Sequence, residues 1–288
     1  MKTIIMTDSC CDLPLEYIKR NNIKTVPLTF HIKNKVYDDD FGQSLDFKEF
    51  YKEISKGEMP TTSQVNVYKF EETFKRLILE GYSIVYIAFS PALSETYSNA
   101  IMTKKTILKE NPSADITIID SRSASIGQGL LVYYACEMLK QGKSKEEIVN
   151  WVENNKLKVN IWFSVDDLSH LKRGGRISAA NAIIGTMLEI KPVLQVDNNG
   201  KLIVTKKIRG RVKSIRELAL LLKNRIVKSE NQTIFIGHCD CIEDANLLKS
   251  LICKEVKVKD VIINYTGAII GAHVGPGMLS VAFIGQNR

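Results

Sequence analysis

A short apolar run, Ile84-Val-Tyr-Ile-Ala-Phe-Ser90, has the length of a buried strand and stops at a polar residue. A helical pattern follows over Leu93–Lys109, and a second strand pattern, Ile116–Ile119, ends at Asp120-Ser121. Apolar runs without alternation are typical of strands that are buried on both faces. Strand, helix and strand in this order predict a βαβ unit, whose two strands lie parallel in one sheet.

The same alternation extends over the rest of the first half of the chain. Lys2–Thr7 and Thr25–Ile32 have strand length, and Pro27 favours a sheet edge for the second because proline cannot donate to a ladder. Gly57–Gln64 is expected to be a loop. Helical patterns cover Leu15–Asn21, Phe47–Ser55, Val67–Glu80, Ile126–Gln141 and Ser144–Lys156. We therefore expect a mainly parallel sheet flanked by helices.

The character of the chain changes near Asn160. Strand patterns at Ile190–Val196 and Lys201–Ile208, joined by the turn residues Asp197–Gly200, predict an antiparallel hairpin. Further strand patterns lie at 160–164, 233–237, 258–263 and 279–284, with helical patterns at 212–228 and 243–251. These patterns favour a mixed sheet with helices. The fold class is thus α/β, and we expect two α/β domains, 1–159 and 160–288.

Composition indicates an ordinary globular protein. The 288 residues are 44% hydrophobic and 25% charged, and no apolar run approaches the ~18 residues of a membrane span. The N-terminal segment becomes polar too early for a secretory signal, so we expect a cytoplasmic protein. The net charge of +8 has denser groups at Lys172–Arg176 and Lys206–Lys213, which fit a solvated face or a surface for docking an acidic partner or a phosphate. No nucleic-acid-binding motif accompanies this charge, so no nucleic-acid partner is expected.

The cysteines do not indicate a metal site. None of the six forms a Cys-x-x-Cys pair, and His238–Cys241 has no second ligand pair at zinc spacing. Asp38–Asp40 lacks the spacing of a calcium loop and is expected to be an acidic surface loop. We expect free thiols and no bound metal.

Two hydroxyl-rich stretches precede helical patterns. Pro60-Thr-Thr-Ser-Gln64 and Ser90–Ser98 can each cap a helix or, because free N–H groups favour negative charge, seat an anion. Three strand patterns also end at polar residues, Thr7-Asp8-Ser9, Phe89-Ser90 and Asp120-Ser121. Ligands of open α/β sheets bind beyond the carboxyl ends of the strands, so these ends and Thr61–Gln64 could line one crevice.

The tail segment Thr266–Gly277 is expected to be an apolar loop, and its glycines allow the backbone to approach a ligand closely. It holds His273, one of four histidines, which is a candidate for the site or a hydrogen-bonded structural group. An alternative function is a small-molecule phosphotransferase or hydrolase that uses His273 or Ser94. However, Ser94 does not lie in a Gly-x-Ser-x-Gly elbow, and no Walker loop is found.

Motifs in a fixed order resemble those of the DegV family over almost the whole chain. They are Thr7–Leu13, Thr62–Gln64, Leu93–Tyr97, Asp120-Ser121, Gly174–Ile177, Lys191-Pro192 and Gly271–Gly277. Members of that family look like the fatty-acid-binding (FakB) subunits of a bacterial fatty acid kinase. The resemblance implies two α/β domains, with a long-chain acid such as palmitate buried in a tunnel and covered by the C-terminal domain.

The resemblance also implies how the acid is used. Its carboxylate would be held by Thr62 and Ser94, with Ser63 and His273 close by. A separate ATP-using kinase subunit would convert it to an acyl phosphate for phospholipid synthesis. The resemblance implies that this chain itself does not catalyse a reaction and that it binds no cofactor besides the fatty acid. Transient contact with a membrane surface is compatible with this role.

Two positions depart from the family pattern. Glu95 stands where glycine usually follows the motif serine, and Val65 stands where proline often follows Ser-Gln. Glu95 places a negative charge beside the carboxylate site unless it points outward. Ala182–Leu188 and Ile269-Ile270 are candidates for the tunnel wall. From charge alone, the candidates for docking the kinase are Arg173, Arg176, Arg209 and Arg211.

Overall fold

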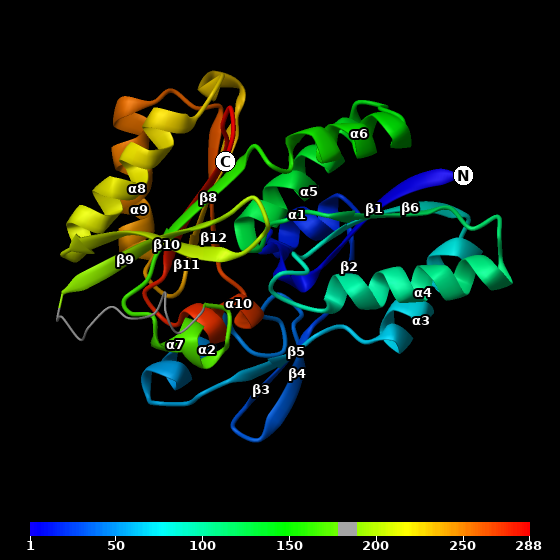
Figure 1. Cartoon of the computed structure of the whole chain (residues 1–288), viewed down its shortest axis with the longest axis horizontal. Helices are drawn as coiled ribbons and strands as arrows, with labels where there is room; N and C mark the ends of the chain where they lie inside the picture. The colour runs from blue at the N-terminus through cyan, green and yellow to red at the C-terminus, as the bar shows by residue number, and fades with distance from the viewer. Residues whose placement is uncertain (178–188) are drawn as a thin grey trace.

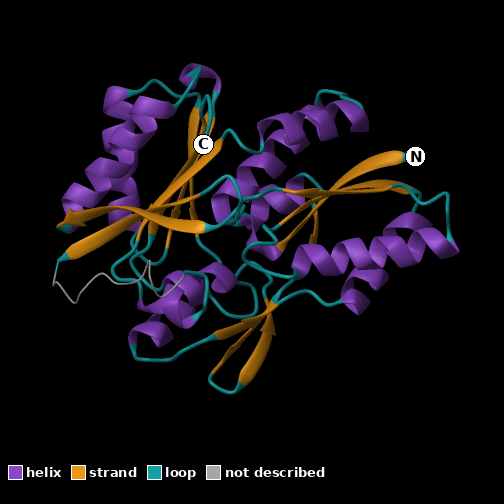
Figure 2. Ribbon diagram, viewed as in Figure 1, coloured by secondary structure: helices purple, strands orange, loops and turns teal. Residues whose placement is uncertain are grey.

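The computed structural model describes residues 1–177 and 189–288, and the strands of this part form three sheets (Figures 1 and 2). The first sheet has four parallel strands in the order β2-β1-β6-β7. Its strands are β1 (Lys2–Asp8), β2 (Lys24–Val26), β6 (Tyr82–Ala88) and β7 (Ile116–Asp120). The expected βαβ unit is therefore present, with β6 and β7 paired in parallel.

The second sheet has six strands in the order β10-β9-β8-β13-β11-β12, and among its pairs only β11 and β12 run parallel. Its strands are β8 (Val159–Ser164), β9 (Ile190–Val196), β10 (Leu202–Arg209), β11 (Thr233–His238), β12 (Asp260–Tyr265) and β13 (Leu279–Ile284). A small antiparallel sheet has the order β4-β3-β5, with β3 (Thr29–Ile32), β4 (Lys35–Asp38) and β5 (Thr61–Ser63). A parallel sheet and a mixed sheet, both flanked by helices, confirm the expected fold class.

Helices cover both large sheets. The α-helices of the described residues are α1 (Leu15–Arg20), α2 (Phe47–Ser55), α3 (Val67–Leu79), α4 (Thr96–Glu110), α5 (Ser125–Lys140), α6 (Lys145–Asn155), α7 (Ser169–Arg173), α8 (Arg211–Arg225), α9 (Ile242–Glu255) and α10 (Ala268–Val274). Helices α3 and α4 pack on one face of the first sheet, and α8 and α9 on one face of the second. Figure 1 shows α5 between the two large sheets and the small sheet below them.

Helix α5 shares one apolar core with both large sheets. Most of its first half is buried, and two glycines allow close approach at that end. A Cβ on Gly129 would lie 2.3 Å from the carbonyl oxygen of Cys11, and one on Gly127 would lie 2.4 Å from Ser123 Oγ. Helix α5 belongs to the first half of the chain but packs on the second sheet, so the two halves share a core. The expected domain division between residues 159 and 160 stays a prediction.

The segment Thr25–Ile32, expected to be one strand, is two strands in different sheets. β2 is the edge strand of the first sheet, and β3 is the central strand of the small sheet. The break falls at Pro27, which has no N–H to continue either ladder. A hairpin joins β3 to β4, with Lys33 and Asn34 at positive φ in its turn.

The expected loop Gly57–Gln64 also contains a strand. β5 pairs with β3, placing Thr62 opposite Phe30. The cap of the following helix is Asn66, whose side chain accepts a hydrogen bond from the N–H of Lys69 at 2.9 Å. The hydroxyls of Thr61–Ser63 are therefore not used as a cap for this helix.

The polar strand ends are buried rather than gathered in a crevice. Asp8 Oδ2 accepts hydrogen bonds from Tyr86 Oη at 2.9 Å and from the N–H of Phe89 at 2.8 Å. Ser90 and Ser121 have no exposed surface. The side chains of Asp8, Ser90 and Ser121 are hydrogen-bonded to other groups of the protein, so the expectation that these strand ends line a ligand crevice is wrong for them. Phe89 and Thr62–Gln64, which were expected in the same crevice, do line the cavity described below.

Two further acids are buried next to this region. Asp12 Oδ1 accepts from the N–H of Gly267 at 2.9 Å, and its other oxygen accepts from the Ser125 hydroxyl. Asp39 is only 3% exposed, so the expectation of an acidic surface loop at Asp38–Asp40 is wrong for this residue. Burial raises the pKa of Asp12 to about 7 and the pKa of Asp39 to about 8, because a low-dielectric setting disfavours the charged carboxylate.

Stability should therefore fall as the pH rises. Between about pH 4 and about pH 8 the folded chain keeps protons on Asp39 and Asp12 that the unfolded chain has lost, at up to ~1.4 kcal/mol per pH unit for one proton. Asp39→Asn should reduce this slope, as measured by urea unfolding across that range. Glu72→Gln, at an exposed position on α3, is the control. An equal slope in wild type and Asp39→Asn would contradict the assignment.

Candidate functional site

A cavity of about 390 Å³ lies between the sheets. This volume is within the ~300–1,000 Å³ range of small-molecule sites. Both halves of the chain contribute to its lining, which consists of Leu28, Thr62, Ser63, Gln64, Phe89, Leu93, Ser94, Ala124, Ser125, Ile161, Phe163, Leu171, Arg176, Val196, Leu202, Ile269, Ile270, His273, Val274, Met278 and Ser280. Most of these side chains are apolar, and no acidic side chain among the described residues lines the cavity.

Hydroxyls gather at one end of the cavity. Thr62 Oγ1 lies 2.8 Å from His273 Nε2, a hydrogen bond between residues 211 positions apart. Ser94 Oγ is hydrogen-bonded to Thr96 Oγ1 at 2.9 Å, and Ser63 and Gln64 complete this polar end. The four predicted ligand-binding residues thus line the same cavity. Their role in holding a carboxylate stays a prediction.

His273 lies in the last turn of α10, where a loop was expected. The helix ends at Gly275, whose φ of +78° favours glycine. Burial, together with the nearby charges of Arg176 and Arg173, lowers the pKa of His273 to about 4. The imidazole is therefore neutral at physiological pH, and its Nε2 can donate to or accept from Thr62 depending on its tautomer.

Gly174 brings the basic loop against this imidazole. A Cβ at this position would lie 2.2 Å from His273 Nδ1. The backbone of Gly174 is right-handed helical, with φ of −71°, so only the contact with His273 demands glycine here. The motif Gly174–Ile177 thus packs on the histidine that pairs with Thr62.

Arg176 lies in the cavity wall, although it was proposed for docking a partner. Its Nε donates to the carbonyl of Leu93 at 3.2 Å, and its Nη1 donates to the carbonyl of Gly174 at 2.5 Å. Burial lowers the pKa of Arg176, but guanidinium remains charged in proteins. The charge pattern identified the basic loop, but not which of its side chains turns inward.

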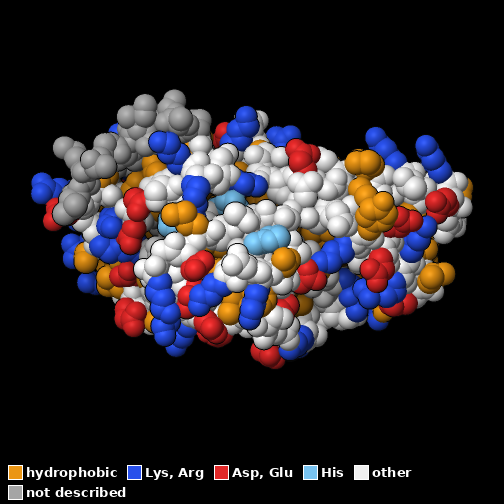
Figure 3. Space-filling model, turned by 90° about the horizontal axis from the view of Figure 1, so that it is seen from below, with side chains coloured by type: hydrophobic (Ala, Val, Ile, Leu, Met, Phe, Trp, Pro, Cys, Tyr) orange, Lys and Arg blue, Asp and Glu red, His pale blue; other side chains and the backbone are white. Residues whose placement is uncertain are grey.

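The other three arginines differ in their surroundings. Arg173 is exposed and its Nη2 lies 3.1 Å from His170 Nδ1, whereas Arg209 forms an exposed ion pair with Glu189. The Arg211 side chain is only 21% exposed, and its Nε donates to Asp244 at 2.8 Å. Arg211 is thus held within the fold, so its charge is not free to bind a partner. Figure 3 shows the face seen from below, where basic side chains lie near histidines.

Three further sequence expectations concern the cavity lining. Ile269 and Ile270 line the cavity, and Ala182–Leu188 lies outside the described residues. Glu95 is exposed at the N-terminal end of α4 and does not line the cavity, so its charge points outward. Val65 is buried, and its N–H donates to Thr96 Oγ1 at 3.3 Å.

The residues weighed for metal binding or catalysis have other partners. His238 packs on Tyr265 with ring centroids 4.3 Å apart, and Tyr51 Oη donates to Cys239 Sγ at 3.1 Å. Across residues 1–177 and 189–288, no group of His, Cys, Asp or Glu is arranged to hold a metal ion. Ser94 and His273 bond to Thr96 and Thr62 rather than to each other, which does not favour a serine–histidine pair. None of the described helices has the length and apolar character needed to cross a membrane.

The contact between Gly174 and His273 gives a measurable prediction. In Gly174→Ala the new methyl group should displace the imidazole from its buried position and raise the pKa of His273 from about 4 toward ~6.5. An NMR titration of the histidine ring signals measures this shift. Asn154→Ala, at an exposed position on α6, is the control, because it changes neither the charge nor the packing around His273. An unchanged pKa in Gly174→Ala would contradict the close contact.

Comparison with known proteins places the chain in a family. The model of the uncharacterised proteins of the DegV family matches residues 2–286. A DegV domain-containing protein of Clostridium perfringens is 47% identical over 100% of this chain and 99% of its own length. Two solved structures are also similar. The fatty-acid-binding DegV of Bacillus subtilis is 31% identical, with a TM-score of 0.84, and the match covers 99% of this chain and 100% of that one. A stearic-acid-binding protein of Eubacterium ventriosum is 26% identical, with a TM-score of 0.85, and the match covers 98% of each chain. The chain belongs to the DegV family.

Proposed function

We propose that this protein binds a long-chain fatty acid in the cavity and presents its carboxylate to a separate ATP-dependent fatty acid kinase subunit. The observation that carries the proposal is a single cavity with an apolar body and an end made of hydroxyls, a neutral histidine and one arginine. Such a lining suits a molecule with a long apolar tail and an anionic head. The fatty acids bound by solved relatives, including stearic acid, have this form.

The tail supplies most of the affinity in this assignment. Each buried methylene contributes ~0.8 kcal/mol, so a tail of about fifteen contributes on the order of 10 kcal/mol before the costs of binding. A hydrogen bond to a charged group contributes ~1.5–3 kcal/mol. Thr62, Ser63, Ser94 and His273 therefore position the carboxylate rather than determine how tightly the acid binds.

Arg176 supplies the positive charge beside this carboxylate. Two of its nitrogens already donate to carbonyls of the protein, which fixes the guanidinium at the polar end of the cavity. Its charge attracts the head of the acid, while Thr62 and Ser94 are available to donate hydrogen bonds. This arrangement binds the ionised acid, which is the form that can attack a phosphoryl group.

Phosphoryl transfer to that carboxylate is assigned to the partner. The reaction needs a nucleotide and metal site to position the γ-phosphoryl group and to neutralise its charge. The family resemblance implies a separate subunit for this step, and the exposed Ser63 and Arg173 lie on the part of the surface next to the polar end. The partner would work in the cytoplasm, with the acyl phosphate feeding phospholipid synthesis, and the acid could arrive by transient contact with a membrane surface.

The test of binding is native mass spectrometry of the freshly purified protein, followed by solvent extraction. Wild type should carry a non-covalent adduct of fatty-acid mass. Thr62→Ala and Ser94→Ala should retain the adduct, because the apolar tail dominates affinity, but should lose most acyl phosphate formation with the kinase subunit and ATP. Thr106→Ala, on the exposed side of α4, is the control and should behave as wild type.

Two outcomes would contradict this assignment. A protein of bare mass that takes up no fatty acid when one is offered would remove the binding function and favour an enzyme acting on a small substrate. Equal loss of binding and of phosphorylation in Thr62→Ala and Ser94→Ala would remove the division between affinity and positioning.

Partner docking should depend on exposed arginines. Arg173→Glu and Arg209→Glu together should raise the dissociation constant of the kinase complex by roughly tenfold or more at low salt, and less at high salt, because exposed charges are screened. Surface plasmon resonance at two salt concentrations measures this effect. Arg216→Glu, exposed on α8, is the control for a charge reversal elsewhere on the surface. Arg211 is left unchanged because its loss would disturb Asp244.

An unchanged dissociation constant in the double variant would remove the arginines from the docking surface. An equal increase in Arg216→Glu would show that only the net charge matters.

A further inference from the structure

The hairpin of β9 and β10 forms part of the cavity wall. Val196, at the end of β9, and Leu202, at the start of β10, both line the cavity. Ile161 and Phe163 of β8 line it as well, and Phe163 pairs with Leu194 of β9. This register places Ile161 toward the hairpin turn and Phe163 toward the end of β8 that leads to α7.

The two ends of the cavity can be told apart along β8. After β8 the chain forms α7, and Gly174 at the end of α7 contacts His273 of the polar end. Ile161 and Val196 lie in the opposite direction along the strands. The hairpin turn, residues 197–201, therefore stands beside the apolar end of the cavity.

The 197–201 turn is well ordered by its own hydrogen bonds. Asp197 Oδ1 accepts from the N–H groups of Asn199 at 2.8 Å and Lys201 at 2.9 Å. The N–H of Asp197 also donates to the carbonyl of Lys201 at 2.8 Å, and Gly200 has a φ of +77°. These contacts tie the turn into one hydrogen-bonded unit.

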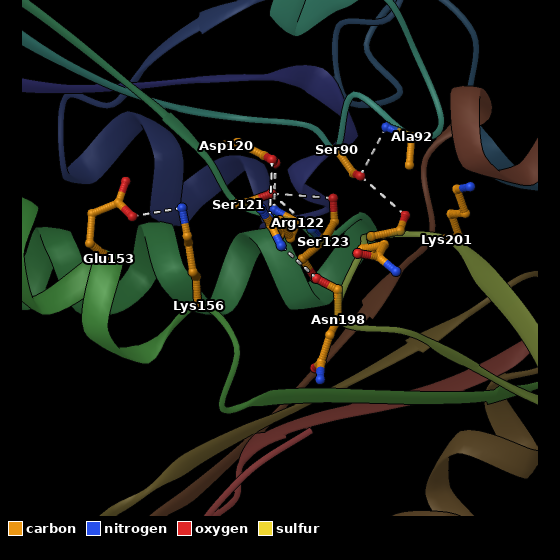
Figure 4. A network of polar contacts seen from close by, with 12 residues as sticks. Ser90, Ala92, Asp120, Ser121, Arg122, Ser123, Glu153, Lys156, Asn198 and Lys201 are labelled. Carbon is orange, nitrogen blue, oxygen red and sulfur yellow. Dashed lines mark hydrogen bonds and ion pairs between the residues drawn. The ribbon is translucent and has the colours of Figure 1, made fainter.

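Side chains from outside the hairpin hold this unit by its carbonyl groups (Figure 4). Ser90, after β6, donates from Oγ to the carbonyl of Gly200 at 3.1 Å. Arg122, after β7, donates from Nη1 to the carbonyl of Asn198 at 3.0 Å. Arg288 donates from Nη1 to the carbonyl of Asp197 at 2.7 Å. The turn is thus fixed on the carboxyl ends of the first sheet.

Gly200 makes this contact tight. A Cβ at Gly200 would lie 2.1 Å from Ser90 Oγ and 3.3 Å from Arg122 Cα. The turn therefore lies directly against the first sheet, with no space for a side chain between them. Polar contacts of this kind can be loosened by one substitution, while β9 and β10 stay paired along their length.

We propose that the 197–201 turn, held by Ser90 and Arg122 on the first sheet, sets the length of acyl chain that the cavity accepts. The inference rests on the proposed fatty-acid binding. With the turn in place, Val196 and Leu202 bound the apolar end, and an acid longer than the cavity must bend or leave its head contacts. With the turn released, these two side chains withdraw and further methylenes are buried. Each buried methylene corresponds to about a fourfold gain in affinity.

The experiment is competitive loading of the delipidated protein with an equimolar series of saturated acids, from lauric to arachidic, read by native mass spectrometry. Arg122→Ala should raise the bound ratio of arachidic to palmitic acid by roughly fourfold or more over wild type, with one acid still bound per chain. Ser90→Ala should shift the ratio in the same direction. Leu202→Ala, which removes part of the wall directly, should also favour longer acids.

Arg216 is exposed on α8, far from the turn, and Arg216→Ala removes the same charge as Arg122→Ala. This control should leave the bound ratio of arachidic to palmitic acid unchanged from wild type. If Arg122→Ala and Ser90→Ala keep the wild-type ratio while Leu202→Ala shifts it, the turn contacts do not set chain length and the proposal is overturned. If Leu202→Ala shifts nothing either, the hairpin does not bound the acyl chain, which also overturns it. Failure of wild type to load any acid would instead reject fatty-acid binding itself.

Discussion

The burial of helix α5 between the two large sheets is the constraint on which the rest of the molecule depends. Gln128 shows how closely it is held, since its Nε2 donates to Thr7 Oγ1 at 3.0 Å and to Asp8 Oδ1 at 3.1 Å. On the other side of the helix, Tyr133 packs edge-on against Phe235 of β11, with ring centroids 5.5 Å apart. Close-packed contacts on both sides leave the helix no freedom to shift, so the first and second sheets keep one separation.

The cavity exists because the two large sheets stay apart beyond the N-terminal end of α5. Ala124 and Ser125 are the first residues at this end of α5, and both line the cavity. Beyond them, in the part of the chain that the structure describes, no helix fills the space between Phe89, which follows the first sheet, and Phe163 of the second. The small sheet then brings in Thr62, so three sheets contribute to a single site. A hollow produced in this way is set by the architecture as a whole rather than by any one loop.

This origin explains what could be read from the sequence and what could not. The alternation of strands and helices follows from local patterns, and it predicted the first sheet and the β9–β10 hairpin. The contact between Thr62 and His273 joins residues 211 positions apart, and no local pattern encodes it. The arginines make the same point: Arg176 turns into the cavity and Arg211 is held by Asp244, although both stand in similarly basic stretches. Pro27 indicated only an edge position for one strand, whereas the break at this residue and the sheet that each half joins depend on long-range pairing.

Under the proposed function, the polar end would place a carboxylate without holding it strongly. A carboxylate that must react as a nucleophile loses reactivity when several full charges and short hydrogen bonds stabilise it. Here the single arginine already donates to two carbonyls, and the low pKa of His273 keeps its ring neutral beside Thr62. Affinity is left to the apolar body, where contact is independent of the charge on the acid. Under the proposed function, separating the two tasks would allow the head group to change from carboxylate to acyl phosphate while the tail remains bound.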